Sequence, residues 1–263
     1  MIIISGPCSL ESYQHGIDSA LYLKEFFDQY PVDFYFKTSF TKANRTSGDS
    51  PRGAGIDTLL AVWSYLNTDN RSNNGHFINM LTDVHEVDQV EYIVNSPALC
   101  ETHFDLALQI PALLSRQTDL INAAANTGKI VNIKKGQFMS PHDMKHAKEK
   151  AKNAKEVWLT ERGTSFGYNN LVVDFRSLVI MSEENPDAKI IFDCTHSTQL
   201  PGASGKSSGG ERKFALPLAK AAVAVGVDGL FFETHEAPDS APSDGDVMLP
   251  WSDLKQFMDT VMK

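Results

Sequence analysis

Residues 34–47 read FYFKTSFTKANRTS, and within this stretch an apolar segment changes abruptly into a basic one. The aromatic residues 34–36 favour a β-strand. The segment that follows delivers Lys37, Lys42 and Arg45 within nine positions, with no acidic residue among them. Three cations on one loop suit an anionic ligand such as a phosphate or a carboxylate, although ordinary solvated loops also carry such clusters.

The same unit, an apolar segment followed by polar residues and a helical pattern, recurs along the whole chain. Strands are expected at residues 2–4, 32–36, 77–81, within 103–108, and at 129–133, 156–159, 189–192 and 229–232. Helices are expected after Ser12 and at residues 56–66, 87–94, 117–126, 141–152, 171–181, 214–225 and 251–262. Eight such units in 263 residues predict an α/β fold, a single-domain (β/α)8 TIM barrel over residues 1–263. A doubly wound open sheet has the same alternation and is the alternative.

Composition excludes several classes of function. The formal net charge of −9 argues against general affinity for nucleic acid or for membranes. No apolar run reaches the roughly 18 residues that a membrane helix needs. Three cysteines far apart in the chain do not suggest a disulfide framework. We therefore expect a cytoplasmic protein that binds neither nucleic acid nor membrane.

A polar residue stands at or just after the carboxyl end of every expected strand. These residues are Cys8, Lys37, Asp83, Gln109, Lys134, Arg162, His196 and Glu233. In a TIM barrel the carboxyl ends of all strands meet at one mouth, where active sites lie. With Lys42, the cations of this set suit a substrate that carries two anionic groups. Because neighbouring residues on a strand alternate, Lys135 is expected to face away from Lys134.

Cys8, His196 and Glu233 end strands that are neighbours in a closed barrel, and Asp244 lies on the loop after Glu233. A thiol, an imidazole and carboxylates together are ligands for a divalent transition metal. The residues alone also permit a buried structural cysteine and a structural histidine. Further candidate ligands are Cys194 and His235.

Several motifs resemble those of the 3-deoxy-D-manno-octulosonate 8-phosphate synthases. They are GPCSLES at 6–12, FKTSF at 36–40 with KANRTS at 42–47, TDVHE at 82–86, RQTDL at 116–120, NIKKGQF at 132–138, ERG at 161–163 with FGYNNL at 166–171, FDCTHS at 192–197 and SGG at 208–210. The resemblance covers essentially the whole chain. The KANR and RQTD segments separate this family from the related synthase of the aromatic pathway.

The resemblance implies condensation of phosphoenolpyruvate with D-arabinose 5-phosphate and water, which serves lipopolysaccharide biosynthesis. The residues that it implies to be catalytic are Lys37, Lys42, Asp83, Lys134, His196 and Asp244. Those implied to bind substrate are Ser39, Asn44, Arg45, Thr46, Gln109, Arg116, Lys134, Arg162 and Phe166. Arg116 is expected to reach the sugar phosphate from a neighbouring subunit of a homotetramer, whereas its sequence context alone suggests an ordinary exposed helix arginine.

The family has metal-dependent and metal-independent forms, and the latter carry Asn where this chain has Cys8. The resemblance therefore implies the metal-dependent form, with one divalent ion (Zn, Fe, Mn or Co) held by Cys8, His196, Glu233 and Asp244. Residues 197–210, rich in Gly and Ser, are expected to be mobile and to close over the mouth. Two rivals remain: a Schiff-base aldolase with Lys134 as nucleophile, and a non-catalytic barrel that binds sugar phosphates.

Overall fold

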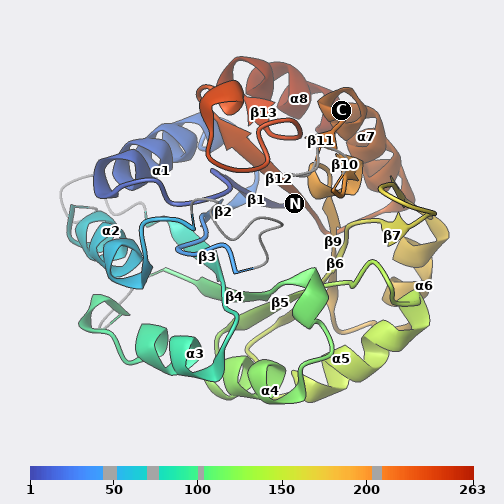
Figure 1. Cartoon of the computed structure of the whole chain (residues 1–263), viewed down its shortest axis with the longest axis horizontal. Helices are drawn as coiled ribbons and strands as arrows, with labels where there is room; N and C mark the ends of the chain where they lie inside the picture. Colours follow the sequence, from blue (N-terminus) through green and yellow to red (C-terminus); the bar gives the residue numbers. More distant parts are fainter. Residues whose placement is uncertain (44–51, 70–76, 100–103, 203–208) are drawn as a thin grey trace.

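Eight parallel strands form a closed barrel at the centre of the computed structural model, which describes residues 1–43, 52–69, 77–99, 104–202 and 209–263 (Figure 1). The strands are β1 Ile2–Gly6, β2 Asp33–Lys37, β3 Asn79–Asp83, β4 Leu106–Ile110, β5 Ile130–Lys134, β6 Val157–Glu161, β9 Lys189–Asp193 and β12 Gly229–His235. Their order around the barrel follows the chain, and β12 pairs with β1 to close it. The TIM barrel is thus confirmed, and the open doubly wound sheet is excluded.

In the described part of the chain, eight α-helices surround the strands, and Figure 1 shows them on the outside of the barrel. They are α1 Tyr13–Phe27, α2 Ile56–Asp69, α3 Val87–Val94, α4 Thr118–Asn126, α5 Met144–Lys150, α6 Arg176–Glu184, α7 Ala215–Val225 and α8 Leu254–Val261. In α1, the side chain of Ser12 accepts a hydrogen bond from the backbone N–H of His15 and caps the helix, as its position predicts. Among the described residues, no helix has both the length and the apolar character needed to cross a membrane.

The core has two layers because alternate residues of each strand face opposite sides. Ile3 belongs to the large cluster between strands and helices, whereas its neighbours Ile2 and Ile4 belong to a second cluster inside the barrel. The other members of this inner cluster are Tyr35, Leu81, Ala107, Ile130, Trp158, Ile191 and Phe231. Burial of each large apolar side chain contributes about 1.5–3 kcal/mol. The ring of Phe231 lies next to Lys134, His196 and Lys37, so it separates these residues of the mouth from the inner cluster below.

Two short antiparallel strand pairs lie at the mouth of the barrel, and two expectations from the sequence need correction in this region. The helix expected at residues 171–181 is α6, which begins only at Arg176, because β8 (Leu171–Val172) pairs with β7 (Thr164–Ser165) in an antiparallel hairpin. Gln109 lies within β4 rather than after it, so its side chain is held more firmly than a loop residue would be. A second antiparallel pair joins β10 (Gln199–Leu200) to β11 (Gly209–Gly210). Of the loop expected to be mobile, residues 203–208 lie outside the described residues.

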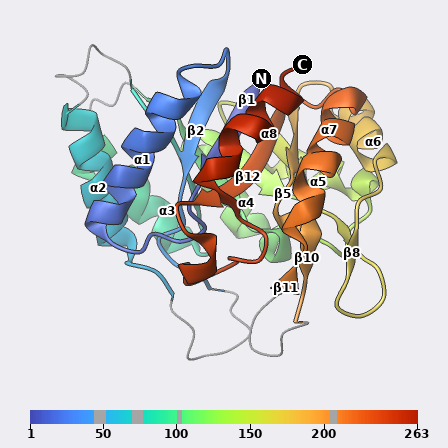
Figure 2. The same ribbon diagram turned by 90° about the horizontal axis from the view of Figure 1, so that it is seen from above.

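Gly6 allows β1 and β2 to approach closely at the mouth. A Cβ atom at this position would lie 2.1 Å from the carbonyl oxygen of Lys37, so no other residue fits without a shift of the backbone. This close approach brings the Cys8 segment beside Lys37. Figure 2 shows β10 and β11 at one end of the barrel and the two chain termini at the other. The end with β10 and β11 is the one at which the carboxyl ends of the barrel strands lie.

Candidate active site

A cavity of about 540 Å³ opens at the carboxyl ends of the strands. The residues predicted from the sequence that line it are Lys37, Lys42, Asp83, Gln109, Lys134, Arg162, His196 and Asp244. They come from seven of the eight strands or from the segments that follow them, including the loop after β12. This convergence at one mouth is the placement that the sequence predicts for a barrel.

Other predicted site residues lie elsewhere. Asn44, Arg45 and Thr46 are outside the described residues. Phe166 is 69% exposed between β7 and β8 and does not line the cavity, because the hairpin turns its side chain outward. Arg116 is exposed just before α4, and its carbonyl oxygen accepts a hydrogen bond from Lys150 Nζ, 3.0 Å away. Within one chain the structure therefore does not bring Phe166 and Arg116 to the cavity.

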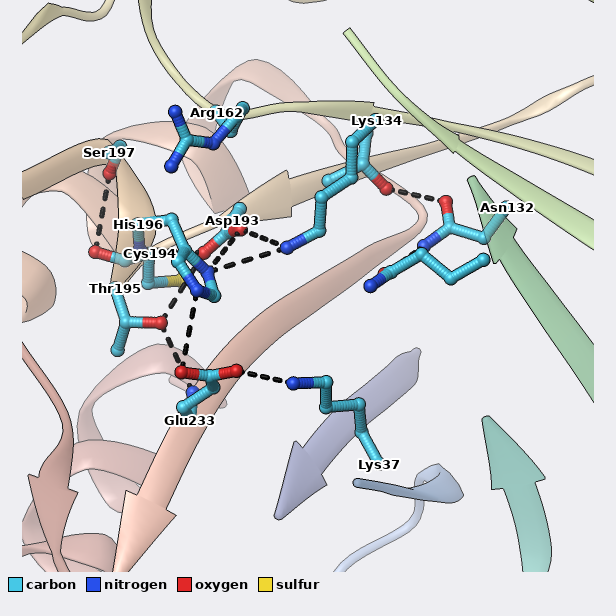
Figure 3. Close-up of polar contacts among 12 residues, drawn as sticks. Lys37, Asn132, Lys134, Arg162, Asp193, Cys194, Thr195, His196, Ser197 and Glu233 are labelled. Atoms are coloured by element: carbon cyan, nitrogen blue, oxygen red, sulfur yellow. Dashed lines mark hydrogen bonds and ion pairs between the residues drawn. The ribbon is translucent and has the colours of Figure 1, made fainter. Parts of the chain in front are cut away.

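Lys37 is almost completely buried and forms an ion pair with Glu233 on β12 (Figure 3). Its ammonium group also donates to the carbonyl oxygen of Cys8, 3.0 Å away. Burial raises the pKa of Glu233, but Lys37, His196 and Lys42 outweigh it and hold the pKa of that carboxyl below its ordinary value. Lys37 therefore keeps Glu233 ionised beside Cys8.

Lys134, Asp193 and His196 form a second buried group (Figure 3). Asp193 Oδ2 lies 2.6 Å from Lys134 Nζ and 2.8 Å from His196 Nδ1. The ammonium group of Lys134 also lies 3.7 Å from the centre of the Phe231 ring, a cation–π contact. Burial lowers the pKa of Lys134, although Asp193 opposes this effect. Since Nδ1 faces Asp193 and Lys134, Nε2 is the ring nitrogen that faces Glu233.

Lys42 and Arg162 keep donors available for a ligand. Lys42 Nζ donates to Ser39 Oγ, 3.0 Å away, and an ammonium group has two further N–H bonds. Arg162 Nη2 donates to Gln199, while Nη1 is buried and has no hydrogen-bond partner among the described residues. A buried guanidinium nitrogen without a partner is unfavourable, and an anion in the cavity would satisfy it.

Behind Arg162 lies a buried ion pair on the outer side of the barrel wall. Lys135 faces away from Lys134, as strand alternation predicts, and its Nζ is 3.6 Å from Glu161 Oε2. Glu161 also accepts hydrogen bonds at 2.6 Å from the N–H of Gly163 and from Ser177 Oγ. These contacts fix the residues on either side of Arg162 and so fix the direction of its side chain.

Asp83 lies at the end of a hydrogen-bond chain that crosses the mouth. Its carboxylate accepts from Ser39 Oγ and Gln109 Nε2, and Gln109 Oε1 accepts from Asn132 Nδ2, 2.9 Å away. Burial raises the pKa of Asp83, but Lys37 and Lys42 outweigh burial and hold the pKa well below its ordinary value. Asp83 is therefore an ionised partner of the lysines and a poor proton acceptor.

Three of the four predicted metal ligands lie together. Ligand atoms of Cys8, Glu233 and Asp244 are all within 4.8 Å of one another, and Cys8 Sγ is 3.0 Å from Asp244 Oδ2. His196 Nε2 is 3.4 Å from Glu233 Oε2, which is buried and has no hydrogen-bond partner among the described residues. An imidazole nitrogen and an unpartnered carboxylate oxygen that face each other are both potential ligands, and together they fit a bound cation.

A second group of possible ligands, Glu11, His15 and His235, lies near the mouth. The N–H of Ala237 donates to His235 Nδ1 at 3.0 Å, which places the ring proton on Nε2. That proton is donated to Glu11 Oε1, 2.9 Å away. His235 therefore has no free lone pair for a metal, and its contact with Glu11 ties the segment after β1 to the end of β12.

Sequence reasoning missed Asp193, Glu161 and Gln199. Asp193 could have been found, because an acidic residue three positions before His196 can reach its ring when the chain turns. Cys194 is fully buried in the outer core, because the strand ends at Asp193 and the turn His196–Thr198 redirects the chain. Nothing in the sequence indicates that Gln199 would lie between Arg162 and Asp244.

Comparisons with known proteins agree with this arrangement. Residues 1–263 match the DAHP synthetase I family. The chain is 48% identical over 264 residues to a 2-dehydro-3-deoxyphosphooctonate aldolase of Methylobacterium radiotolerans, covering 100% of this chain and 88% of the relative. The proteins of the same name from Rhodopseudomonas palustris (49% over 263 residues, 99% and 86% covered) and Chelativorans sp. (48% over 264 residues, 100% and 90% covered) are equally similar. The family resemblance expected from the sequence is confirmed, since that name is a synonym of 3-deoxy-D-manno-octulosonate 8-phosphate synthase. The chain belongs to the DAHP synthetase I family and, within it, to the 2-dehydro-3-deoxyphosphooctonate aldolases.

Proposed function

We propose that this protein condenses phosphoenolpyruvate with D-arabinose 5-phosphate and water to give 3-deoxy-D-manno-octulosonate 8-phosphate and inorganic phosphate. The observation that carries the proposal is a cavity lined by Lys37, Lys42, Lys134 and Arg162 in a chain of net charge −9. Phosphoenolpyruvate carries a carboxylate and a phosphate, and both need such cations. The 48–49% identity to enzymes named for this activity supports the same assignment.

The four cations have different tasks. Within the described part of the chain, Lys42 and Arg162 have N–H donors without a partner, and so they bind the anionic groups of phosphoenolpyruvate directly. Lys37 and Lys134 are paired with Glu233 and Asp193 and hold these carboxylates in place. Lys134 has a lowered pKa because of burial, and it acts as an electrostatic partner close to the reacting groups.

The reaction follows from this charge arrangement. The cavity holds phosphoenolpyruvate against the sugar aldehyde, which removes much of the entropic barrier to their encounter. C3 of phosphoenolpyruvate forms a bond to the aldehyde carbon, whose oxygen takes up a proton, while positive character develops at C2. Water adds to C2 and loses a proton. The C2–O bond to phosphate then breaks, and phosphate leaves with its oxygen while the new C2 hydroxyl passes its proton to the leaving phosphate and becomes the C2 ketone.

A divalent cation fits the charge balance of the mouth. Among the described residues, Lys37 and Lys134 pair with Glu233 and Asp193, and Lys42 acts electrostatically on Asp83 and Asp244, so that the four cations stand beside four carboxylates. Two phosphorylated substrates bring several further negative charges into the cavity. A metal ion held by Cys8, His196, Glu233 and Asp244 would offset that excess.

The donor set supports the metal-dependent form of the enzyme. Burial raises the pKa of the Cys8 thiol, and Glu233 raises it further, so the thiol stays protonated unless a metal is bound. A thiolate, an imidazole and two carboxylates suit Zn, Fe, Mn or Co. When bound, such an ion polarises a carbonyl oxygen or lowers the pKa of a water molecule. Cys8 provides the thiolate, and Asp193 keeps His196 Nε2 directed at the site.

We also propose a homotetramer in which Arg116 of one subunit completes the sugar-phosphate site of another. The family resemblance supports this proposal, and the exposure of Arg116 is compatible with it. The cytoplasmic location, and the absence of binding to nucleic acid and membranes, stay predictions.

Phosphate release tests the proposed activity. The purified protein with phosphoenolpyruvate should release phosphate when D-arabinose 5-phosphate is added and much less with ribose 5-phosphate or erythrose 4-phosphate. Phosphate release with no aldose selectivity, or none at all, would refute the assignment. Borohydride added during turnover should leave no covalent adduct on Lys134, whereas a Schiff-base aldolase would be trapped. A barrel that only binds sugar phosphates would bind both substrates without releasing phosphate.

A further inference from the structure

Gln199 bridges the anion site and the candidate metal site. It begins β10 and lies half-buried at the wall of the cavity. Its Oε1 accepts a hydrogen bond from Arg162 Nη2 at 2.7 Å, and its Nε2 donates to Asp244 Oδ1 at 2.7 Å. The side chain of Gln199 thus contacts two charged groups. One is the guanidinium of Arg162 in the anion site, and the other is the carboxylate of Asp244 in the candidate metal site.

The two contacts define the orientation of the amide. The amide oxygen of Gln199 must face the guanidinium and its nitrogen must face the carboxylate. In the reverse orientation the amide N–H groups would face the N–H groups of Arg162, and the amide oxygen would face the carboxylate oxygen of Asp244. Both hydrogen bonds involve a charged partner, and such bonds are stronger than neutral ones. An apolar residue of the same size would lose both contacts.

The atoms of Arg162 and Asp244 that Gln199 does not contact face the two ligand sites. With Nη2 held by Gln199, Nη1 of Arg162 stays unpartnered among the described residues and available to an anion. With Oδ1 of Asp244 held, Oδ2 is left to Cys8 Sγ, 3.0 Å away, and to Ser243 Oγ, 2.8 Å away. Gln199 therefore binds one polar atom of Arg162 and one of Asp244, and it leaves the second polar atom of each residue directed at its ligand site.

The surrounding chain fixes Gln199 itself. It pairs with Gly210 on β11. A Cβ atom on Gly210 would lie 2.1 Å from Cγ1 of Val247, so the β10–β11 pair packs directly on the loop that carries Asp244. Asp244 has φ of +55°, a backbone conformation that is uncommon for residues other than glycine, and its carbonyl oxygen accepts from the N–H of Val247 at 3.0 Å. A displacement of either segment would strain both contacts of the Gln199 amide.

We propose that Gln199 is a positioning residue that couples the binding of phosphoenolpyruvate at Arg162 to the binding of the metal at Asp244. The inference rests on the proposed function, because it takes phosphoenolpyruvate and a divalent ion as the two ligands. Coupling between two sites is reciprocal: each ligand tightens the binding of the other by the same factor. Part of this factor comes from direct attraction between the metal and the anion, and the remainder passes through Gln199.

Calorimetric titration measures the coupling without turnover. Phosphoenolpyruvate is titrated into metal-free protein and into Co²⁺-loaded protein, and the ratio of the two dissociation constants gives the coupling factor. Gln199→Met should reduce this factor at least fivefold, and it should weaken phosphoenolpyruvate and Co²⁺ binding each by about tenfold or more, the usual loss for a hydrogen bond to a charged group. Gln199→Asn keeps an amide that is too short to span both partners and should behave in the same way. Gln29→Met, a matched change at an exposed glutamine, should match wild type.

The outcomes separate the inference from the activity on which it rests. A wild-type coupling factor retained by folded Gln199→Met or Gln199→Asn protein would overturn the inference, even if wild type releases phosphate as proposed. A wild type that binds both ligands without coupling would overturn it as well. If wild type shows no phosphate release but Gln199→Met lowers the factor, the proposed function fails and the coupling stands. In steady-state kinetics, a positioning role predicts a larger rise in KM for phosphoenolpyruvate than for the sugar phosphate.

Discussion

Asp193 ends β9 and His196 begins the turn that follows, with Asp193 Oδ2 2.8 Å from His196 Nδ1. A carboxylate on one ring nitrogen fixes the tautomer and directs the other nitrogen at a metal. Asp193→Asn removes that charge with little change in shape and lets the ring rotate. We expect a 10–100-fold weaker affinity for divalent metal, measured by competition with a chelator of known affinity. Asp187→Asn, at an exposed carboxylate paired with Lys148, is the control and should have no effect. Unchanged affinity in Asp193→Asn would show that Asp193 does not orient His196.

Exhaustive chelation should abolish turnover, and added Zn²⁺, Mn²⁺ or Co²⁺ should restore it. Cys8→Ala should lose metal and activity together, because it removes the only sulfur among the three ligands that cluster most closely. Cys8→Asn is the more informative change, since it installs the residue of the metal-independent form; it should weaken metal binding and leave measurable activity. Residual metal is measured alongside activity. Full activity in metal-free wild type would refute the metal-dependent form while leaving the synthase assignment intact.

The sequence was sufficient for the barrel because each strand is short, apolar and closed by a polar residue, and the order of units alone defines the topology. It also predicted, from strand alternation, that Lys134 and Lys135 face opposite sides of the barrel wall. It failed where local pairing outweighs periodicity, as at Leu171, whose apolar neighbours suggest a helix although it lies in a hairpin. It could not find Gln199, because a contact over 45 positions to Asp244 leaves no local pattern.

Arg116 provides a test of the assembly. If it completes the site of another subunit, Arg116→Ala should raise KM for the sugar phosphate while KM for phosphoenolpyruvate changes little. Specific activity of wild type should also fall on dilution if subunits separate. Sedimentation velocity at each assay concentration checks whether the loss follows dissociation. A fully active monomer would contradict the shared site, and Arg176→Ala, at an exposed arginine on α6, serves as a control.

Asp83 should stabilise the fold in a pH-dependent manner. Its pKa lies below the ordinary value of 3.8, because Lys37 and Lys42 outweigh burial. A carboxyl with a depressed pKa in the folded state stabilises the protein above its unfolded pKa, and that stability is lost as the pH falls below it. Asp83→Asn should therefore lower the unfolding free energy at pH 7 by about 3–5 kcal/mol, and the difference from wild type should shrink steadily below about pH 4. Urea unfolding of metal-free protein at pH 7 and pH 3 measures it, with exposed Asp18→Asn as control. A difference independent of pH would mean that the charge is not involved.

Lys135 and Glu161 form a buried pair that does not face the cavity, so their effect on Arg162 is indirect. Removing one partner leaves an uncompensated charge in the core, and Glu161→Leu or Lys135→Met alone should each cost about 3–5 kcal/mol. The double variant should recover part of that loss, because two apolar residues leave no charge behind, although Gly163 N–H and Ser177 Oγ lose their acceptor. Urea unfolding of wild type, the two single variants and the double variant completes the double-mutant cycle.

Since Glu161 fixes the backbone on both sides of Arg162, the double variant should still show a raised KM for phosphoenolpyruvate even where its stability recovers. If stability recovers and KM equals the wild-type value, the Lys135–Glu161 pair affects only the stability of the fold. The side chain of Arg162 would then be oriented by its contact with Gln199 and not by this pair.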